Sequence, residues 1–360
     1  MTEPFAPKKN ILVAPLNWGL GHATRCIPII NALLENGYNP ILASDGVALA
    51  LLKKEFPDLV ALELPSYGIE YAKKASNFKW KLIKNSHKTI NAIFCEKKWV
   101  KKWVKEYDLH GIISDNRLGV YNNKVVSVFM THQLNVLSGK TTWFSSKVHQ
   151  YFIRKFNQCW IPDVKGVPNL TGKLGHLKKS DLNLKYIGVL SRLEKQKLEK
   201  VYDLMILLSG PEPQRTLLEE KLIDELKDYK EKVVFIKGKV EPQQTKEVVN
   251  NVTFFNYMQT KELERTFNES DKILCRSGYT TIMDLAKLEK KAFFIPTPGQ
   301  FEQEYLGKRL MKQGLAPSEK QHLFKIVDLS SLSVYKGFRN INSEINWKEL
   351  FGLFERERKL

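Results

Sequence analysis

The sequence contains few cysteines, no long apolar run and fewer acidic than basic side chains. Its four cysteines are scattered through 360 residues, with no Cys-x-x-Cys pair and no His/Cys cluster, so neither a disulfide framework nor a structural zinc site is predicted. This pattern fits a reducing compartment such as the cytoplasm. No stretch of about 18 apolar residues occurs, so no membrane-spanning helix is expected. The cysteines are Cys26, Cys95, Cys159 and Cys275.

The charge balance is strongly basic. Lysine and arginine number 57 against 39 acidic residues, which gives a formal net charge of +18 and a pI near 9.5. Such a balance predicts an anionic partner, whether a phosphorylated substrate, an acidic membrane surface or nucleic acid. The length suits two domains, and the polar segment Met1–Lys9 has no basic-then-apolar signal pattern, so we expect a cytoplasmic protein.

One stretch of the chain reads twice as strand, tight loop and helix. An apolar strand over Lys272–Cys275 leads through a turn into a helix from Thr281, and a second strand over Ala292–Pro296 leads into a helix over Phe301–Gln313. Two such units place two helix N-termini at one edge of a parallel sheet, where backbone N–H groups bind phosphate. The small and hydroxyl residues predicted to contact the anion are Ser277, Gly278, Thr280 and Thr281.

The runs Arg276–Leu285 and Pro296–Tyr305 resemble the donor-binding segment of family 28-like glycosyltransferases, a group that includes the transferase acting on the undecaprenyl-linked peptidoglycan precursor. The resemblance implies an α/β protein of the GT-B fold, with two Rossmann-like domains facing a cleft, parallel sheets and a C-terminal helix that crosses back. It also implies a nucleotide-sugar donor, UDP-linked, and no further cofactor. In the family pattern Asp284 binds the ribose hydroxyls. The second helix opens with the residues expected at the donor sugar, Glu302, Gln303 and Glu304. Glu304 stands where the family has its second glutamine.

The first apolar strand, Asn10–Leu16, runs into a glycine-containing loop and a helix over Arg25–Asn36. With Asp45 about twenty residues further on, the loop partly matches a dinucleotide-binding G-x-G-x-x-G, but Thr24 replaces the third glycine. The loop is also similar to the Gly-His loop that faces the cleft in GT-B glycosyltransferases. It comprises Asn17, Trp18, Gly19, Gly21 and His22.

The resemblance implies that His22, or a nearby carboxylate, is the general base. A positive helix end disfavours the imidazolium, so a neutral His22 at this position would remain a base. Packing or capping is the alternative. Asp115 and His132 follow two predicted strands, Gly111–Ser114 and Val125–Phe129, at the edge where parallel sheets bind ligands. Asp115 is a second candidate base, and Asn17, Trp18 and His132 are candidate acceptor-side residues, with loop capping as the alternative.

A linker over Gly188–Lys200 divides the chain into two predicted domains, an acceptor-side domain over residues 1–188 and a donor-binding domain over residues 189–360. In the second domain, Ser209 and Gly210 resemble the family's loop at the donor diphosphate. Arg215 either pairs with a phosphate or lies at the surface. The family places its contact to the nucleotide base at Tyr257 and Met258. An apolar stripe over Ile345–Leu360 predicts the helix that crosses back.

The stretch Tyr71–Tyr107 is rich in lysine and aromatic residues. Trp99, Trp103 and Tyr107 are four residues apart and share a helix face. Three readings remain open: contact with an anionic lipid surface, contact with nucleic acid, and packing of the aromatic face on its own domain. The residues predicted to contact a membrane are Lys98, Trp99, Lys101, Lys102 and Trp103.

These observations predict an inverting glycosyltransferase that moves a sugar from a nucleotide-sugar to a hydroxyl acceptor, a lipid-linked alcohol being one candidate. The sequence has no Asp-x-Asp motif, so no metal is expected. One alternative is a nucleotide-sugar epimerase or hydrolase on the same fold. Another is a non-enzymatic basic protein that binds a membrane or nucleic acid, although the donor-like segment argues against this alternative. We expect no nucleic-acid partner. We expect a location in the cytoplasm or on the cytoplasmic face of a membrane.

Overall fold

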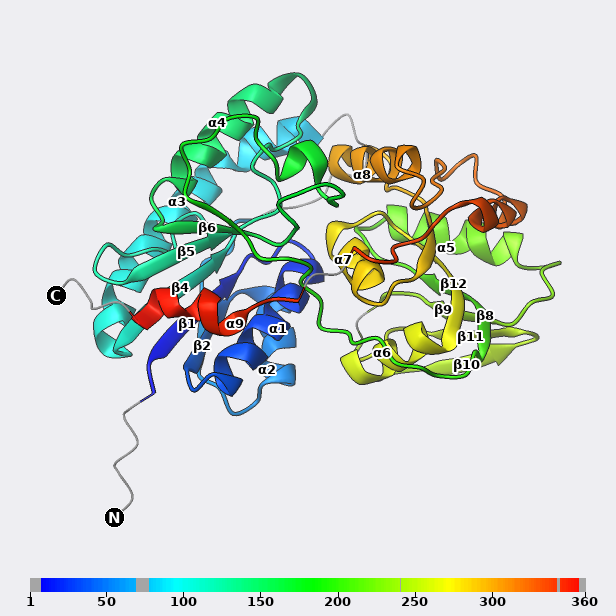
Figure 1. Ribbon diagram of the computed structural model, residues 1–360, viewed down its shortest axis with the longest axis horizontal. Helices are drawn as coiled ribbons and strands as arrows, with labels where there is room; N and C mark the ends of the chain where they lie inside the picture. The colour runs from blue at the N-terminus through cyan, green and yellow to red at the C-terminus, as the bar shows by residue number, and fades with distance from the viewer. Residues whose placement is uncertain (1–7, 69–77, 240, 342–343, 356–360) are drawn as a thin grey trace, which may run out of the picture.

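The computed structural model describes residues 8–68, 78–239, 241–341 and 344–355, with the backbone alone for residues 78–86. Two α/β domains lie side by side, each built on its own sheet (Figure 1). The alternation of strands and helices in the sequence predicted this architecture.

The first sheet has seven parallel strands in the order β3-β2-β1-β4-β5-β6-β7. The order reverses between β1 and β4, so the crevice at the carboxyl ends of these two strands is where such a sheet binds ligands. The strands are β1 (Asn10–Pro15), β2 (Asn39–Ser44), β3 (Ala61–Glu63), β4 (Leu109–Asp115), β5 (Val126–Met130), β6 (Gln158–Ile161) and β7 (Leu184–Tyr186).

Helices cover both faces of this sheet. In β1, Ile11 and Val13 pack on one side with α1 and α2, whereas Leu12 and Ala14 pack on the other side with α3. Helix α4 covers the same face as α3 further along the sheet, because its Ile153 packs with buried residues of β5 and β6. The helices are α1 (Leu20–Glu35), α2 (Gly46–Glu55), α3 (Phe78–Glu106) and α4 (Thr142–Ile153).

The second sheet has six strands in the order β10-β11-β9-β8-β12-β13. Its order reverses between β8 and β12. The expectation of wholly parallel sheets needs one correction, because the edge strand β10 is antiparallel to β11. The strands are β8 (Tyr202–Leu207), β9 (Val233–Ile236), β10 (Lys246–Val249), β11 (Val252–Phe255), β12 (Ser270–Cys275) and β13 (Lys291–Phe294). The helices are α5 (Gln214–Glu225), α6 (Thr260–Glu269), α7 (Tyr279–Lys287) and α8 (Phe301–Lys312).

The chain end returns to the first domain, as predicted, and appears in red across that domain in Figure 1. Helix α9 (Trp347–Phe351) and a 3₁₀ turn (Gly352–Glu355) replace the longer predicted helix, whose last residues, 356–360, lie outside the described residues. The rings of Phe351 and Tyr38 lie 5.7 Å apart, and Phe354 packs against Gly111 of β4. The apolar stripe of this segment therefore joins the core of the first domain.

Candidate functional site

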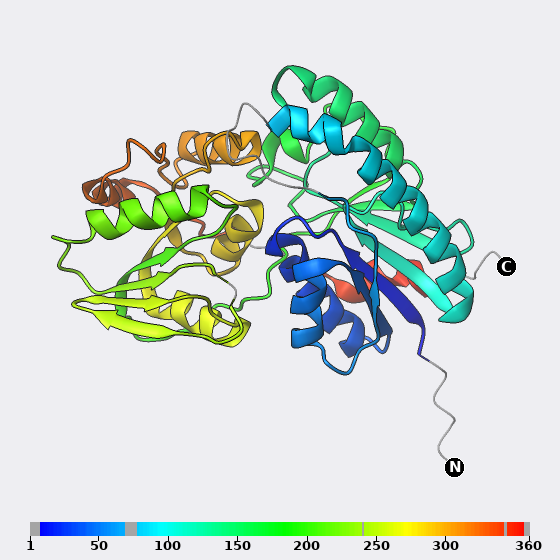
Figure 2. The same cartoon turned by 180° about the vertical axis from the view of Figure 1, so that it is seen from behind.

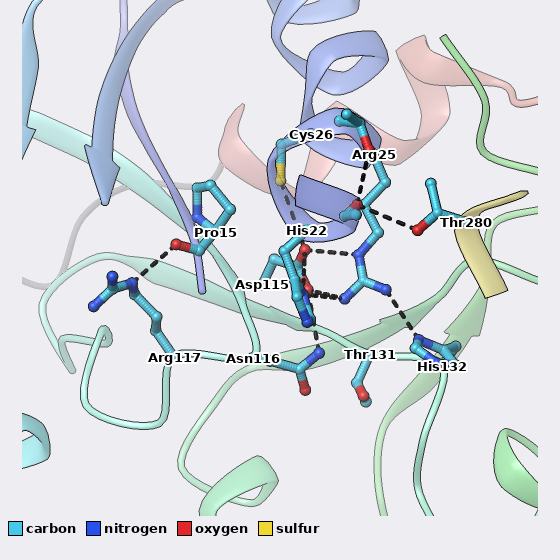
Figure 3. Close-up of polar contacts among 12 residues, drawn as sticks. Pro15, His22, Arg25, Cys26, Asp115, Asn116, Arg117, Thr131, His132 and Thr280 are labelled. Carbon is cyan, nitrogen blue, oxygen red and sulfur yellow. Dashed lines mark hydrogen bonds and ion pairs between the residues drawn. The ribbon is translucent and has the colours of Figure 1, made fainter. Parts of the chain in front are cut away.

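The two residues predicted as candidate bases meet at the carboxyl edge of the first sheet. Asp115 ends β4, and His22 lies in the first turn of α1, which begins after Gly19 in a left-handed conformation (φ 73°). The His22 Nδ1 atom lies 3.1 Å from Asp115 Oδ2. Because β1 and β4 flank the point where the strand order reverses, the fold itself brings this pair together (Figure 3).

Arg25, which the sequence analysis did not single out, is the centre of this cluster (Figure 3). Its Nε atom lies 2.7 Å from Asp115 Oδ2, and its Nη2 atom bonds the other oxygen of that carboxylate. The same guanidinium reaches His132 Nδ1 at 2.9 Å and His22 Nδ1 at 2.7 Å. A signal was present in the sequence, because Arg25 follows His22 by three residues and so shares its helix face.

The cluster is buried, and its charges fix the protonation states. Burial of Asp115 favours its protonated form, but the charges and hydrogen bonds of Arg25 and His22 together outweigh burial and hold the pKa of Asp115 well below its usual range. The pKa of His22 is lowered, first by burial and further by Arg25, with Asp115 acting in the opposite direction. At neutral pH the cluster therefore pairs an ionised carboxylate with a neutral imidazole.

The first domain contacts the second at this edge. His132 Nε2 lies 2.8 Å from Glu302 Oε1 on α8, and the amide of Gln133 donates to the other oxygen of Glu302. The ring of Tyr279, the first residue of α7, stacks on His132 with centroids 4.3 Å apart. The two sheet edges thus face each other across the domain boundary, and a carboxylate of the second domain reaches into the first.

The N-terminus of α7 lies against the glycine-rich loop of the first domain. Thr280 Oγ1 donates to Gly21 O at 3.3 Å. Gly278 caps the helix, and a Cβ atom there would meet nothing within 4 Å, so the space beside it is open to a ligand. Ser277 is buried and its hydroxyl donates to Gln303 O at 2.8 Å, so it ties α7 to α8, while Thr281 is half-buried.

Asp284 lies within α7 and is largely buried. Its Oδ1 atom accepts a hydrogen bond of 2.5 Å from the hydroxyl of Ser191, in the segment between the two domains. Burial raises the pKa of Asp284 to about 6, with Ser191 and Arg192 opposing the shift.

The three residues predicted at the start of α8 have different surroundings. Gln303 accepts from Thr297 N at 2.8 Å and donates to Gln300, and Glu304 accepts from Gly299 N at 2.9 Å. Both side chains brace the loop before α8. Glu302 is the member of the three that reaches the first domain.

The remaining predicted donor contacts lie at other loops of the second domain. Ser209 and Gly210 follow β8 and are exposed, with Gly210 in a left-handed conformation (φ 104°). Arg215 is buried between Glu212 and Glu219 and donates to a backbone carbonyl, so its guanidinium serves an ion-pair network at the start of α5. Tyr257 and Met258 follow β11 and are half-buried.

Two further residues at this edge were missed in the sequence. Arg276 is 1% exposed, donates to the carbonyls of Gln214 and Ile295, and has no hydrogen-bond partner for Nε among the described residues. The Thr297 hydroxyl is likewise buried without a partner in the described part of the chain. A Cβ atom at Gly210 would lie 3.5 Å from it. Unpaired buried donors are costly, so these two groups are further candidates for contact with a ligand.

The lysine-rich helix α3 corrects one prediction. Trp103 is 9% exposed and packs in the core with Val100 and Val104, because the aromatic face turns toward the sheet. Trp99 is 38% exposed, and Lys98, Lys101 and Lys102 lie at the surface. Tyr71, Lys73 and Lys74 of the same predicted stretch lie outside the described residues.

Within the described ranges no three His, Cys, Asp or Glu side chains are grouped so that they could hold a metal ion. None of the helices described is long and apolar enough to cross a bilayer.

Comparison with known proteins gives one family and one fold. Residues 213–335 match the glycosyltransferase family 28 C-terminal domain. A search of curated protein sequences found no match. Similar solved structures include MurG from Acinetobacter baumannii (15% identity, TM-score 0.57, covering 97% of this chain and 99% of that one). Spinosyn forosaminyltransferase SpnP is similar (13%, TM-score 0.63, 97% and 100%), as is glycosyltransferase SnogD from Streptomyces nogalater (12%, TM-score 0.62, 97% and 96%).

The full-length structural matches confirm the two-domain fold, and the family match covers most of the second domain, including α7 and α8. Residues 213–335 thus match the glycosyltransferase family 28 C-terminal domain, and the chain as a whole has the two-domain GT-B fold of these structures.

Proposed function

We propose that this glycosyltransferase is inverting and metal-independent, and that it transfers a sugar from a UDP-sugar to a hydroxyl acceptor. One observation carries the proposal. His22 lies within hydrogen-bonding distance of the buried Asp115, at the edge of the first sheet that faces the N-terminus of α7. A proton acceptor and an anion-binding helix end thereby meet across the domain boundary.

The second domain supplies the donor site. As the bond between sugar and diphosphate breaks, negative charge grows on the leaving group, and preorganised dipoles stabilise it. The N-terminus of α7 beside Gly278, the loop at Gly210 and the buried charge of Arg276 all act in that sense. Asp284 would accept hydrogen bonds from the ribose hydroxyls.

The first domain supplies the base, and His22 suits this role better than Asp115. Asp115 is fully buried, and Arg25 and Asn116 donate to its oxygens, so it is occupied and stays ionised. When His22 carries its proton on Nδ1, it donates to Asp115 and leaves Nε2 free to accept the proton of the attacking hydroxyl. Asp115 then orients the ring and stabilises the imidazolium that forms.

The first test is a binding titration against UDP, GDP, dTDP, UDP-GlcNAc, UDP-galactose and NAD. Saturable, uridine-selective binding that is lost in Asp284→Ala supports the donor site, and binding of NAD alone overturns it. Turnover of a bound UDP-sugar without any acceptor would indicate the hydrolase or epimerase alternative. Transfer to an alcohol with inverted anomeric configuration would establish the proposed reaction.

We also propose that the face formed by α3 and α4 rests on an anionic membrane and brings the enzyme to a lipid-linked acceptor on the cytoplasmic side. Figures 1 and 2 show both helices on the same side of the first sheet. Large apolar side chains stand out from this face among lysines, which suits insertion at an anionic interface. Those at least half exposed are Ile90, Phe94, Trp143, Phe144 and Tyr151.

Binding to vesicles tests this surface. Vesicles with a large fraction of anionic lipid should retain the protein, and replacing Trp143 and Phe144 with serine or Lys98, Lys101 and Lys102 with glutamate should release it. Replacing Val248, which is 63% exposed in the second domain, with serine is the matched control. Equal retention of all variants would show that the face is only solvated.

A further inference from the structure

The Arg25 guanidinium determines which nitrogen of each neighbouring histidine carries a proton. Arginine has five N–H donors, no acceptor, and does not lose its charge in proteins. Any atom at hydrogen-bonding distance from it must therefore offer a lone pair. His132 Nδ1, at 2.9 Å, and His22 Nδ1, at 2.7 Å, are two such atoms.

For His132 the assignment is consistent with every contact. Its Nδ1 atom accepts from Arg25, so the proton of the neutral ring is on Nε2. That nitrogen lies 2.8 Å from Glu302 Oε1 and donates to it. Stacking on Tyr279 keeps the ring in this orientation. An unbroken chain of donors and acceptors therefore runs from Asp115 through Arg25 and His132 to Glu302 of the second domain.

For His22 two contacts compete for one nitrogen. Its Nδ1 atom lies 2.7 Å from Arg25 Nη2 and 3.1 Å from Asp115 Oδ2. It can accept from the arginine or donate to the carboxylate, but not both. The shorter contact is to a group that can only donate, so the lone pair is on Nδ1 and the proton on Nε2. In this tautomer Nε2 cannot take a proton from an acceptor hydroxyl.

We infer that Arg25 is a positioning residue that holds the proposed base, His22, in its inactive tautomer while His132 and Glu302 connect the two domains. When a donor displaces Glu302 from His132, the contact between His132 and Arg25 Nη1 is no longer held in place, and the guanidinium can tilt on its bonds to Asp115 so that Nη2 leaves His22 Nδ1. One proton then leaves Nε2 and one binds Nδ1, with no net change in charge, and Asp115 accepts the new hydrogen bond. The inference rests on the proposed function only for its consequence, since the tautomer itself is a property of the protein without substrate.

The charged and titratable groups around His22 come from four elements. Arg25 and Cys26 belong to its own helix, Asp115 ends β4, His132 follows β5, and Glu302 belongs to α8. Burial raises the pKa of Cys26 well above its usual value, so the thiol stays protonated. The pKa of Glu302 is lowered, because His132 and Arg25 outweigh its burial, so it stays ionised. The thiol and the carboxylate therefore keep their protonation states when the tautomer of His22 changes.

Nitrogen-15 NMR of histidine-labelled protein tests the inference without an activity assay. In the resting protein the proton of His22 should be on Nε2. In Arg25→Met and in Glu302→Ala it should move to Nδ1, and Arg25→Met should also raise the pKa of His22, because a neighbouring positive charge is lost. In wild-type protein, any UDP-sugar of the panel that binds should produce the same tautomer change.

Two matched variants control for structural disturbance. Arg117→Met removes another buried arginine, one that pairs with Asp45 and Glu96, and Lys308→Ala changes an exposed position on α8. Neither should change the His22 signals. If Arg25→Met does not fold, Glu302→Ala and the UDP-sugar titration decide the question.

A resting His22 with its proton on Nδ1 would overturn the inference. So would a tautomer that stays on Nε2 in Glu302→Ala and, where it folds, in Arg25→Met. A protein that switches tautomer as described but transfers no sugar would refute the proposed function and leave the role of Arg25 intact.

Discussion

The two sheet edges that meet at the domain boundary have different kinds of side chains. The edge of the first sheet is a buried charge cluster in which Asp115 accepts from Arg25 and Asn116. The edge of the second sheet has glycines and hydroxyls at its loops, and its one fully buried charge among the described loop residues, Arg276, has no carboxylate partner.

The difference shows what each edge can do. A satisfied cluster of fixed charges keeps an imidazole neutral in a defined orientation, which suits proton transfer. In the proposed function, the open space beside Gly278 and the unpaired donors at Thr297 and Arg276 receive the donor diphosphate. Turnover should therefore depend on the first edge and donor affinity on the second.

The largest effect separating the two edges is expected for His22→Ala. Loss of the base should lower kcat by about 10²- to 10⁴-fold while the dissociation constant for UDP stays the same. Steady-state kinetics and a UDP titration on the same preparation check both halves. His322→Ala, at an exposed histidine of the second domain, is the control. If His22→Ala lost donor affinity instead of turnover, the first edge would contribute to donor binding and the two edges would not have separate roles.

The next effect belongs to the second edge. Asp284→Asn should weaken UDP binding by roughly 10- to 100-fold, because hydrogen bonds to a charged acceptor contribute about 1.5–3 kcal/mol. The pKa of Asp284 is about 6, so wild-type affinity should also fall as the pH drops below that value and the carboxylate is protonated. Calorimetric titrations from pH 5 to 8 measure both effects, with the exposed Asp271→Asn as control. If the UDP affinity of Asp284→Asn still fell at acidic pH, the pH dependence would belong to another group.

The sequence contained enough information for the fold and for part of this comparison. Strand and helix alternation predicted two α/β domains, and the rule that ligands bind past the carboxyl ends of parallel strands placed Asp115 and His132 at one sheet edge. The resemblance of the glycine-containing loop placed His22 at the cleft. The sequence analysis missed Arg25 because an arginine inside a helix usually lies at the surface. The carboxylate that binds its guanidinium belongs to Asp115, 90 residues away, and local sequence does not predict such a contact.

Two other positions depended on geometry that spacing does not encode. Trp99 and Trp103 share a helical face by spacing, yet Trp103 is buried against the sheet and Trp99 is 38% exposed, since an aromatic stripe looks the same whether it faces a core or a bilayer. At the start of α8, neighbouring residues point about 100° apart. The identity of the one that reaches the first domain, Glu302, therefore depended on where the helix begins.

A smaller effect is expected where the two edges touch. A Cβ atom at Gly21 would lie 2.9 Å from Thr280 Oγ1, so Gly21→Ala should hold the domains slightly apart. Overpacking of this kind costs about 1–3 kcal/mol, and we expect kcat to fall roughly tenfold with donor affinity little changed. The double variant Gly21→Ala/Thr280→Ala should be no slower than Thr280→Ala alone, because the colliding oxygen is gone. A double variant with additive losses would mean that Gly21 acts through its own backbone.

The smallest effect is the sharpest test of the second edge. Thr297→Val keeps the shape of the side chain and removes a hydroxyl that is 2% exposed and has no hydrogen-bond partner among the described residues. Removing an unsatisfied buried group should leave the free energy of unfolding unchanged or raise it. If that hydroxyl forms a hydrogen bond with the bound donor, UDP-sugar affinity should also fall about fivefold, the equivalent of one ordinary hydrogen bond of about 1 kcal/mol. Thermal unfolding and donor titration together distinguish the two roles. Loss of a purely structural hydroxyl would lower the stability and leave the donor affinity unchanged. Loss of a ligand-binding hydroxyl would lower the donor affinity and leave the stability unchanged or higher.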